Sequence, residues 1–131
     1  MSKSKTKGFA FEREVAYSLI EGGYKVKRTG NDNIAGIDVI AKDLDTGAFL
    51  IECKRYKGFS WNQLVGMLNK TLEFALDLKG VPILVFKANQ QPALVMYVLR
   101  GVYTVVQFED FFNTPFLKRP KGHTFLKEED G

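Results

Sequence analysis

The sequence of 131 residues predicts a single α/β domain, a mixed β-sheet flanked by helices. Three observations predict this class. Amphipathic, helix-like segments lie at 9–21 and 60–79, and short strand-like runs precede and follow the second segment. The resulting order is a helix, three strands, a long helix and two or three strands. We expect the domain to span residues 1–113 and residues 114–131 to form a loosely held tail, because that tail lacks periodicity.

The first predicted helix, 9–21, contains one acid on its apolar side. Phe11, Val15 and Leu19 recur every four positions and define the buried stripe. On a helical wheel Glu12 falls near the middle of this stripe, whereas Glu14 falls on the opposite side. A carboxylate facing a core is costly unless a charge meets it. Glu12 therefore indicates either a buried salt bridge or a carboxylate aimed at a metal or basic site.

The remaining elements follow from local patterns. We expect strands at 24–29, 37–42, 49–56, 81–86, 92–99 and 102–108, and a helical turn at 109–113. Ser60 and Gln63 form a capping box at the start of the second helix. Gly80 and Pro82 mark its end.

Alternation along the predicted strand 49–56 places Glu52 and Lys54 on one face of the sheet. Cys53 then lies on the opposite face, because successive strand residues point to opposite sides. The cysteine is expected in the core.

The face on which Asp38 lies depends on the turn Asp45-Thr46-Gly47. A three-residue loop pairs Leu44 with Ala48 and places Asp38 opposite Lys54. A two-residue loop would instead place Asp38 beside Cys53. The terminal glycine favours the three-residue loop, so Asp38, Glu52 and Lys54 are expected to converge on one face.

These three residue types suit phosphodiester chemistry. Asp38 and Glu52 offer the hard oxygen ligands that Mg²⁺ prefers. A bound Mg²⁺ can acidify a water and stabilise charge that builds on a phosphate under attack. Lys54 could orient that water, or help to deprotonate it if the site lowers the pKa of the lysine. The alternative to a catalytic site is that these charged residues form two ordinary ion pairs across a hairpin.

The pattern resembles the PD-(D/E)XK nuclease superfamily. It consists of Asp38, a gap of 13 residues and Glu52-Cys53-Lys54, with Glu12 on the preceding helix. The runs 35–41 and 52–56 most resemble the small archaeal-type Holliday junction resolvases, and the resemblance covers roughly residues 7–100. Ile37 stands where the superfamily has its proline. The run 52–56 also resembles Mrr-like restriction nucleases.

The resemblance implies a restriction-endonuclease-like fold, with residues 1–113 as the nuclease domain. It implies an endonuclease that depends on Mg²⁺, with Mn²⁺ as a substitute, and that resolves four-way DNA junctions as a homodimer. Asp38 and Glu52 would be metal ligands, Glu12 an auxiliary acid at the metal, and Lys54 the catalytic lysine. All four are therefore candidate catalytic residues.

The charge of the chain permits a DNA partner without demonstrating one. The net charge is +4 and the pI is near 9.2. Clustered basic residues either form solvated surface or face phosphates, and the second case predicts strongly salt-dependent binding. The candidate DNA-binding residues are Lys5, Lys7, Arg13, Lys27, Arg28, Arg55 and Lys57.

The sequence also bears on location. It has a single cysteine, lacks an apolar run of about 20 residues, and begins without an apolar signal segment. We therefore expect a cytoplasmic protein, in the host cytoplasm if it is viral, with no membrane partner.

Three other functions compete with junction resolution. One is an Mrr-like nuclease that cuts duplex DNA. Another is a catalytically dead DNA-binding domain on the same fold, against which the intact Asp38, Glu52 and Lys54 argue. The third is a retroviral-type aspartic protease, suggested by Asp45-Thr46-Gly47. Such proteases are nearly all strand, which the predicted helix 60–79 contradicts.

Overall fold

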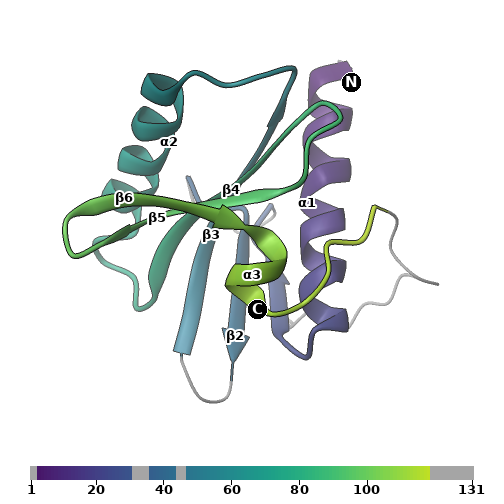
Figure 1. Cartoon of the computed structure of the whole chain (residues 1–131). Helices are drawn as coiled ribbons and strands as arrows, with labels where there is room; N and C mark the ends of the chain where they lie inside the picture. The colour runs from purple at the N-terminus through teal and green to yellow at the C-terminus, as the bar shows by residue number, and fades with distance from the viewer. Residues whose placement is uncertain (1–2, 31–35, 44–46, 119–131) are drawn as a thin grey trace.

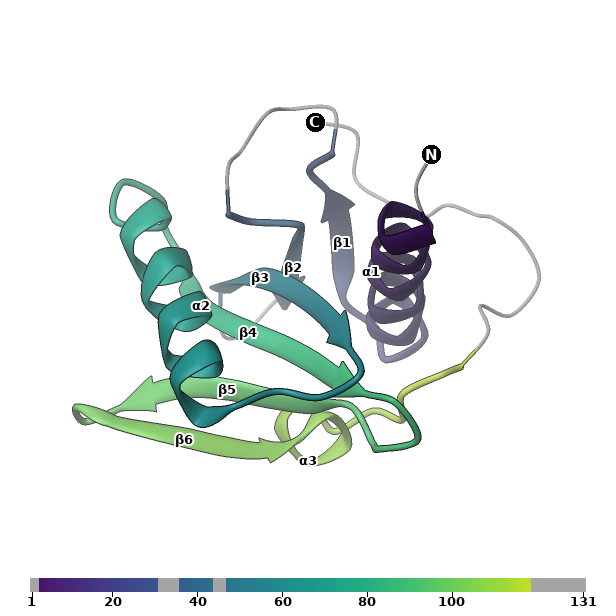
Figure 2. The same ribbon diagram turned by 90° about the horizontal axis from the view of Figure 1, so that it is seen from above.

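A computed structural model describes residues 3–30, 36–43 and 47–118, with side chains from Gly8 onward. In this part of the chain a six-stranded sheet has helices on both faces, as Figures 1 and 2 show. The helices are α1 (Lys3–Glu21), α2 (Trp61–Phe74) and α3 (Phe108–Phe112). The strands are β1 (Lys25–Arg28), β2 (Val39–Asp43), β3 (Gly47–Tyr56), β4 (Val81–Ala88), β5 (Leu94–Leu99) and β6 (Val102–Gln107). The predicted element order and fold class are confirmed.

The strands follow chain order across the sheet, from β1 to β6. Only β3 and β4 pair in parallel, and their neighbours pair antiparallel. A parallel pair needs a long crossover, which α2 supplies on one face of the sheet (Figure 1). Helices α1 and α3 pack on the other face, so β3 and β4 are covered on both sides.

Two apolar layers therefore hold the molecule together. The layer under α1 and α3 contains Phe11, Leu19, Ile51, Val85 and Phe108, all fully buried. The layer under α2 contains Leu64, Leu68, Leu84, Phe86 and Met96. Alternate residues of β3 and β4 thus enter different layers, and Glu52 and Lys54 share the α2 side with Leu84 and Phe86.

Helix α1 is buried over a wider arc than the wheel predicted. Glu14 and Ser18, expected on the solvent side, are 9% and 0% exposed. The chain after α3 covers Ser18, because the Leu117 amide donates to Ser18 Oγ at 2.8 Å and Phe116 packs on Phe11. Glu14 instead pairs with Arg55 of β3. The first residues of the predicted tail thus contact α1, whereas 119–131 lie outside the described residues.

Helix α2 has the predicted start and an earlier end. Ser60 and Gln63 form the reciprocal capping box. The predicted end near residue 79 is wrong, since the helix stops at Phe74 and Ala75 is its C-cap. Beyond it Leu76 is 80% exposed, so its apolar character was not a sign of helix packing.

The β2–β3 register differs from the predicted one by one residue on each strand. Asp43 pairs with Gly47, and Ala48 pairs with Lys42 rather than with Leu44. Continued backward, this register sets Asp38 opposite Glu52 rather than Lys54. The prediction that Asp38 faces the same side as Glu52 still holds, because the two registers differ by an even number of residues.

Two further expectations can be compared with this fold. The mixed sheet with helices on both faces rules out the aspartic-protease alternative, whose fold is nearly all strand. None of the helices in the described ranges is long and apolar enough to cross a membrane.

Candidate active site

The four predicted catalytic residues line one groove beside the middle of the sheet. Glu12, Asp38, Glu52 and Lys54 line a hollow of about 310 Å³. A second hollow of about 390 Å³ lies toward α2 and shares Asp38, Glu52 and Lys54 with the first. The two hollows are thus parts of one groove between α1 and α2, and its shared wall carries the ionisable groups.

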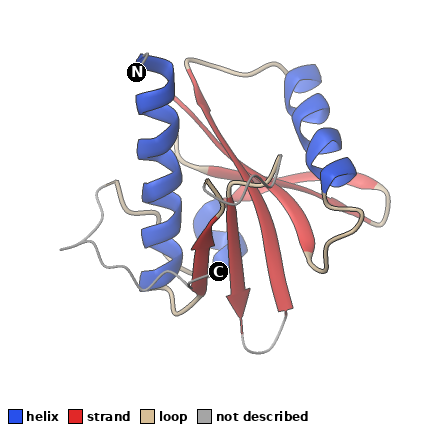
Figure 3. Cartoon of the chain, turned by 180° about the vertical axis from the view of Figure 1, so that it is seen from behind, coloured by secondary structure: helices blue, strands red, loops and turns tan. Residues whose placement is uncertain are grey.

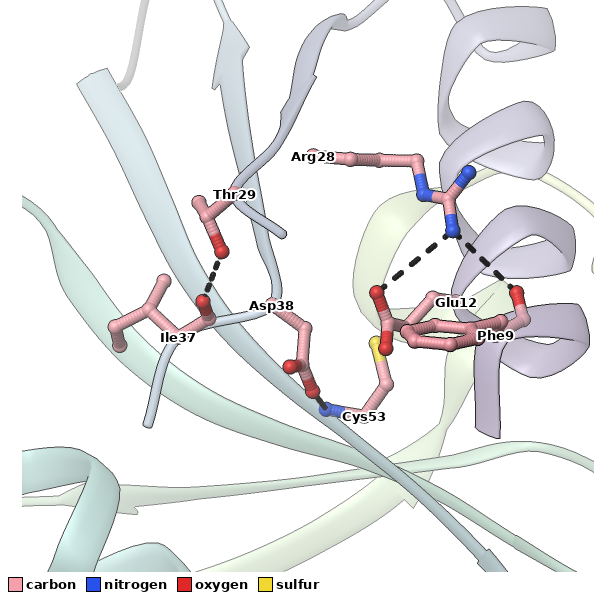
Figure 4. Close-up of polar contacts among 7 residues, drawn as sticks. All are labelled: Phe9, Glu12, Arg28, Thr29, Ile37, Asp38 and Cys53. Carbon is pink, nitrogen blue, oxygen red and sulfur yellow. Dashed lines mark hydrogen bonds and ion pairs between the residues drawn. The ribbon is translucent and has the colours of Figure 1, made fainter. Parts of the chain in front are cut away.

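The sheet itself positions Asp38, which lies just before β2. The Asp38 amide donates to the Ile51 carbonyl at 2.7 Å, and its carbonyl accepts from the Thr29 amide at 3.0 Å. Its carboxylate Oδ2 then accepts from the Cys53 amide at 2.8 Å (Figure 4). Asp38 is therefore held from β1 and β3 at once, and its side chain is fixed against the strand that carries Glu52.

Gly36, two residues before Asp38, allows the chain to pack closely against α2. Gly36 has φ +75°, and a Cβ added there would lie 2.0 Å from Cδ2 of Phe74 on α2. A side chain at this position would therefore meet both backbone strain and a direct clash. The close packing of the chain against α2 depends on this glycine.

Glu52 and Asp38 share a site that favours a cation. Glu52 is 9% exposed and shares a side-chain hydrogen bond with Asp38. Burial, this hydrogen bond and the Asp38 charge raise the pKa of Glu52 to about 8, although Lys54 opposes the shift. Two carboxyl groups in contact repel unless a proton or a cation lies between them.

Lys54 completes the group as a charged donor. Its Nζ lies 3.6 Å from Oε1 of Glu52. Burial lowers the pKa of Lys54, but the charges of Glu52, Tyr56 and Asp38 outweigh burial, so the net pKa is raised. The expectation that the site lowers the pKa of this lysine is therefore wrong for the metal-free protein. Lys54 acts there as a cation that donates hydrogen bonds.

Glu12 reaches the groove from α1, with its side chain 14% exposed. Burial and the Asp38 charge raise its pKa to about 7, and Arg28 and Lys54 lower it. Arg28 lies 3.8 Å from Glu12 Oε1 and also donates to the Phe9 carbonyl (Figure 4). Glu12 thus has the salt-bridge partner that one interpretation predicted, and it also borders the groove.

The carboxylates fit a magnesium ion that is completed by water and substrate. Within residues 8–30, 36–43 and 47–118, no three acidic, histidine or cysteine side chains form a ready metal cage. Mg²⁺ is usually held by one or two carboxylates together with waters and substrate phosphates. Asp38 and Glu52 provide that pair, and Glu12 lines the same hollow.

The predicted DNA-binding residues lie in different settings. Lys5 and Lys7 are on the first turns of α1, Arg13 is exposed on the same helix, and Lys57 is exposed just beyond β3. Arg28 and Arg55 are largely buried and pair with Glu12 and Glu14, the Arg55–Glu14 distance being 3.6 Å. Lys27 on β1 is half-buried.

Sequence patterns missed two lysines. Lys70 of α2 lines the groove opposite Lys54. Lys87 on β4 is only 7% exposed. An exposed helix lysine gives no periodic signal, but Lys87 directly follows the apolar run 81–86, where a cation is unusual.

The fold and the groove together define a nuclease of the PD-(D/E)XK type. A family model described as a restriction endonuclease, of the Mrr catalytic type, matches residues 4–83. The chain belongs to this family and is a DNA endonuclease. No curated protein sequence matches the chain.

A solved structure shows the same fold. The Holliday junction resolvase Hjc of Archaeoglobus fulgidus superposes with a TM-score of 0.53 and 16% sequence identity. The match covers 85% of this chain and 92% of that one. The resemblance to archaeal resolvases is thus confirmed at the level of the fold.

Proposed function

We propose that this endonuclease resolves four-way DNA junctions by paired phosphodiester cleavage, with Mg²⁺ or Mn²⁺ bound by Asp38 and Glu52. The observation that carries the proposal is the contact among Asp38, Glu52 and Lys54 in one groove. The likeness to a junction resolvase over most of both chains supports the choice of substrate.

A divalent ion at this site would acidify the attacking water and offset charge on the phosphate. Asp38 is fixed by the Cys53 amide and would hold the ion in one place. The Lys54 ammonium would donate to the attacking water or to a phosphate oxygen and so orient the attack. Glu12 borders the same hollow and would assist as an outer acid.

Paired cleavage also implies a homodimer. The groove described above offers one set of catalytic residues per chain, and symmetric cuts on two strands need two sets related by a two-fold axis. The apolar run Ala93 to Leu99, which the sequence suggests as part of a dimer interface, buries Ala93, Val95 and Met96 within the fold. Its end and the adjacent β6 carry the exposed apolar residues Val98, Leu99, Val102 and Val105, which we propose as the dimer surface.

The second candidate is an endonuclease acting on ordinary duplex DNA. The Mrr-type family model favours it, since that model is described as a restriction endonuclease. The same catalytic groove would serve either substrate.

Cleavage of matched DNA substrates distinguishes the two functions. A labelled synthetic four-way junction and a linear duplex of the same arm sequences are each incubated with the full chain and Mg²⁺. Paired, symmetric nicks on the junction, with the duplex intact, support resolution. Equal cutting of the duplex contradicts the junction proposal and supports the second candidate.

A further inference from the structure

A second cavity lies on the opposite side of the sheet from Glu52 and Lys54. It has a volume of about 300 Å³. The end of β4, the β4–β5 loop, the start of α3 and the chain after α3 form its walls, and Figure 2 shows these segments at one edge of the molecule. Its floor is apolar, made by Ala93, Phe108 and Phe116, and its rim carries the amides of Gln90, Gln91 and Gln107.

Lys87 in the wall of this cavity is a buried cation. Only 7% of the residue is exposed. In the part of the chain that the structure describes, no salt bridge joins it to an acid. Burial lowers its pKa, and the neighbouring cations Arg55 and Lys118 lower it further. Cations held close together repel one another unless an anion joins them.

The nearby acid does not supply that anion. The charge of Glu14 raises the pKa of Lys87, but the salt bridge of Glu14 is with Arg55, at 3.6 Å. Glu109 lies at the rim and is exposed, and it is not among the charges that act on Lys87. Arg55 and Lys87 thus share a single buried carboxylate, Glu14, and Lys118 adds a further positive charge near Lys87.

Arg55 connects this cavity with the catalytic groove. It lines the hollow that contains Glu12 and Asp38, and its Cα is paired with that of Lys87 across β3 and β4. Its Nε is buried without a hydrogen-bond partner. Arg55 thus lines the catalytic groove and is the strand partner of Lys87, which lines the second cavity.

We propose that the Lys87 cavity binds a backbone phosphate of the DNA substrate outside the catalytic groove. The amides of Gln90 and Gln107 and the ammonium of Lys118 would complete the anion site. This inference rests on the proposed function, because it assigns a further contact to the same DNA strand. Its effect is on binding and salt dependence, since the cavity contains none of the catalytic carboxylates.

Binding of the full-length protein to a labelled four-way junction, measured without divalent metal over a series of salt concentrations, tests the proposal. Lys87→Met removes the charge and keeps the aliphatic stem. We expect junction affinity to fall roughly threefold to tenfold and the log–log salt slope to fall by about 0.9, the value for one phosphate contact. Lys118→Gln should act in the same direction. Lys79→Gln, an exposed lysine away from both cavities, should bind as the wild type does.

Thermal stability separates a binding role from a structural one. Lys87→Met should keep or raise Tm, because it removes a buried charge without a close partner. A loss of Tm with unchanged affinity would mean a structural lysine and overturn the proposal. If Lys87→Met does not fold, Lys118→Gln decides the question, and wild-type affinity and slope there overturn it.

Inorganic phosphate identifies the source of the anion. If phosphate raises the Tm of the wild type but not of Lys87→Met while both bind DNA equally, the cavity takes free phosphate and the proposal is wrong. If the wild type neither binds nor cuts DNA, the proposed function fails as well. The wild-type measurement reveals this without any variant. Wild-type binding with no effect of either variant overturns only this inference.

Discussion

At the scale of single residues, the contact between Glu52 and Asp38 raises the pKa of Glu52. Burial and the neighbouring carboxylate raise the pKa of Glu52 from 4.5 to about 8. Between pH 4.5 and about pH 8, Glu52 therefore keeps its proton in the folded metal-free protein and loses it in the unfolded chain. Folding stability must fall as pH rises through this window, since the unfolded state binds fewer protons there.

Glu52→Gln should reduce this pH dependence. Thermal unfolding in a chelator, from pH 5 to pH 9, should show a wild-type Tm that declines by several degrees, and a shallower decline in the variant. Some decline remains, because the pKa of Glu12 is also raised, to about 7. Glu21→Gln, at an exposed position, is the control and should retain the wild-type profile. A variant profile as steep as that of the wild type would contradict the assignment.

Lys54→Ala should separate cleavage from binding. The ammonium is 3.6 Å from Glu52 and remains charged, so its loss removes a donor to the reacting groups. We expect single-turnover cleavage with Mg²⁺ to slow by about 10² to 10⁴ times, with junction affinity within a few-fold of the wild type. Lys79→Ala should cleave normally. Normal cleavage by Lys54→Ala would remove the lysine from the mechanism.

Sequence reasoning at this scale succeeded where the local pattern was sufficient. Strand alternation placed Glu52 and Lys54 together and Cys53 in the core, where it is 8% exposed. It failed for Glu14, which looked solvent-facing on α1. Its partner Arg55 lies on β3, in another part of the chain, and no helical wheel contains that information.

At the scale of elements, the approach of α2 to the segment before β2 shapes the groove. Phe74 at the end of α2 packs over Gly36, and the same two residues line the larger hollow. The sequence predicted the start of α2 from its capping box. It did not predict the end, because apolar residues continue beyond Phe74 without being buried.

Gly36→Ala should destabilise the fold and the site together. A Cβ would lie 2.0 Å from the Phe74 ring, at a backbone φ of +75°. We expect a loss of about 3 kcal/mol and a fall in Tm of about 10 °C. Gly66→Ala, with nothing within 4 Å of the added atom, should instead stabilise α2 by up to about 1 kcal/mol. Equal Tm values for the two variants would contradict the packing.

The β2–β3 hairpin shows the limit of prediction at this scale. Gly47 has the predicted positive φ of 89°, yet it pairs with Asp43 on β2 instead of lying in the loop. A glycine identifies a turn but does not distinguish registers that differ by an even number of residues. The prediction that Asp38 and Glu52 lie on the same face of the sheet still holds, although the predicted register was wrong. It depends only on which face of its strand each residue occupies.

At the scale of the whole molecule, the β5–β6 hairpin carries the proposed dimer surface. Leu99 and Val102 are paired across the hairpin and are 53% and 62% exposed. Adjacent exposed apolar residues at a sheet edge are typical of interaction surfaces.

Leu99→Asp combined with Val102→Asp should give a monomer, because two charges would enter the apolar contact. Light scattering should report twice the chain mass for the wild type and a single chain mass for the double variant. Leu76→Asp, at a residue that is 80% exposed elsewhere, should not change the mass. A double variant that remains a dimer would place the interface elsewhere, and a monomeric wild type would contradict paired cutting by a stable dimer.

The central claim is that Asp38, Glu52 and Lys54 form a metal-dependent DNA-cutting site. The most direct test is cleavage of a labelled four-way junction by wild type and Asp38→Asn, with Mg²⁺, with Mn²⁺ and with a chelator. We predict cleavage by the wild type only when metal is present, and a loss of roughly a thousandfold in the variant, about 4 kcal/mol of transition-state stabilisation, with junction binding retained. A wild type that cuts no DNA with any divalent metal, or an Asp38→Asn variant that cuts normally, would contradict the account.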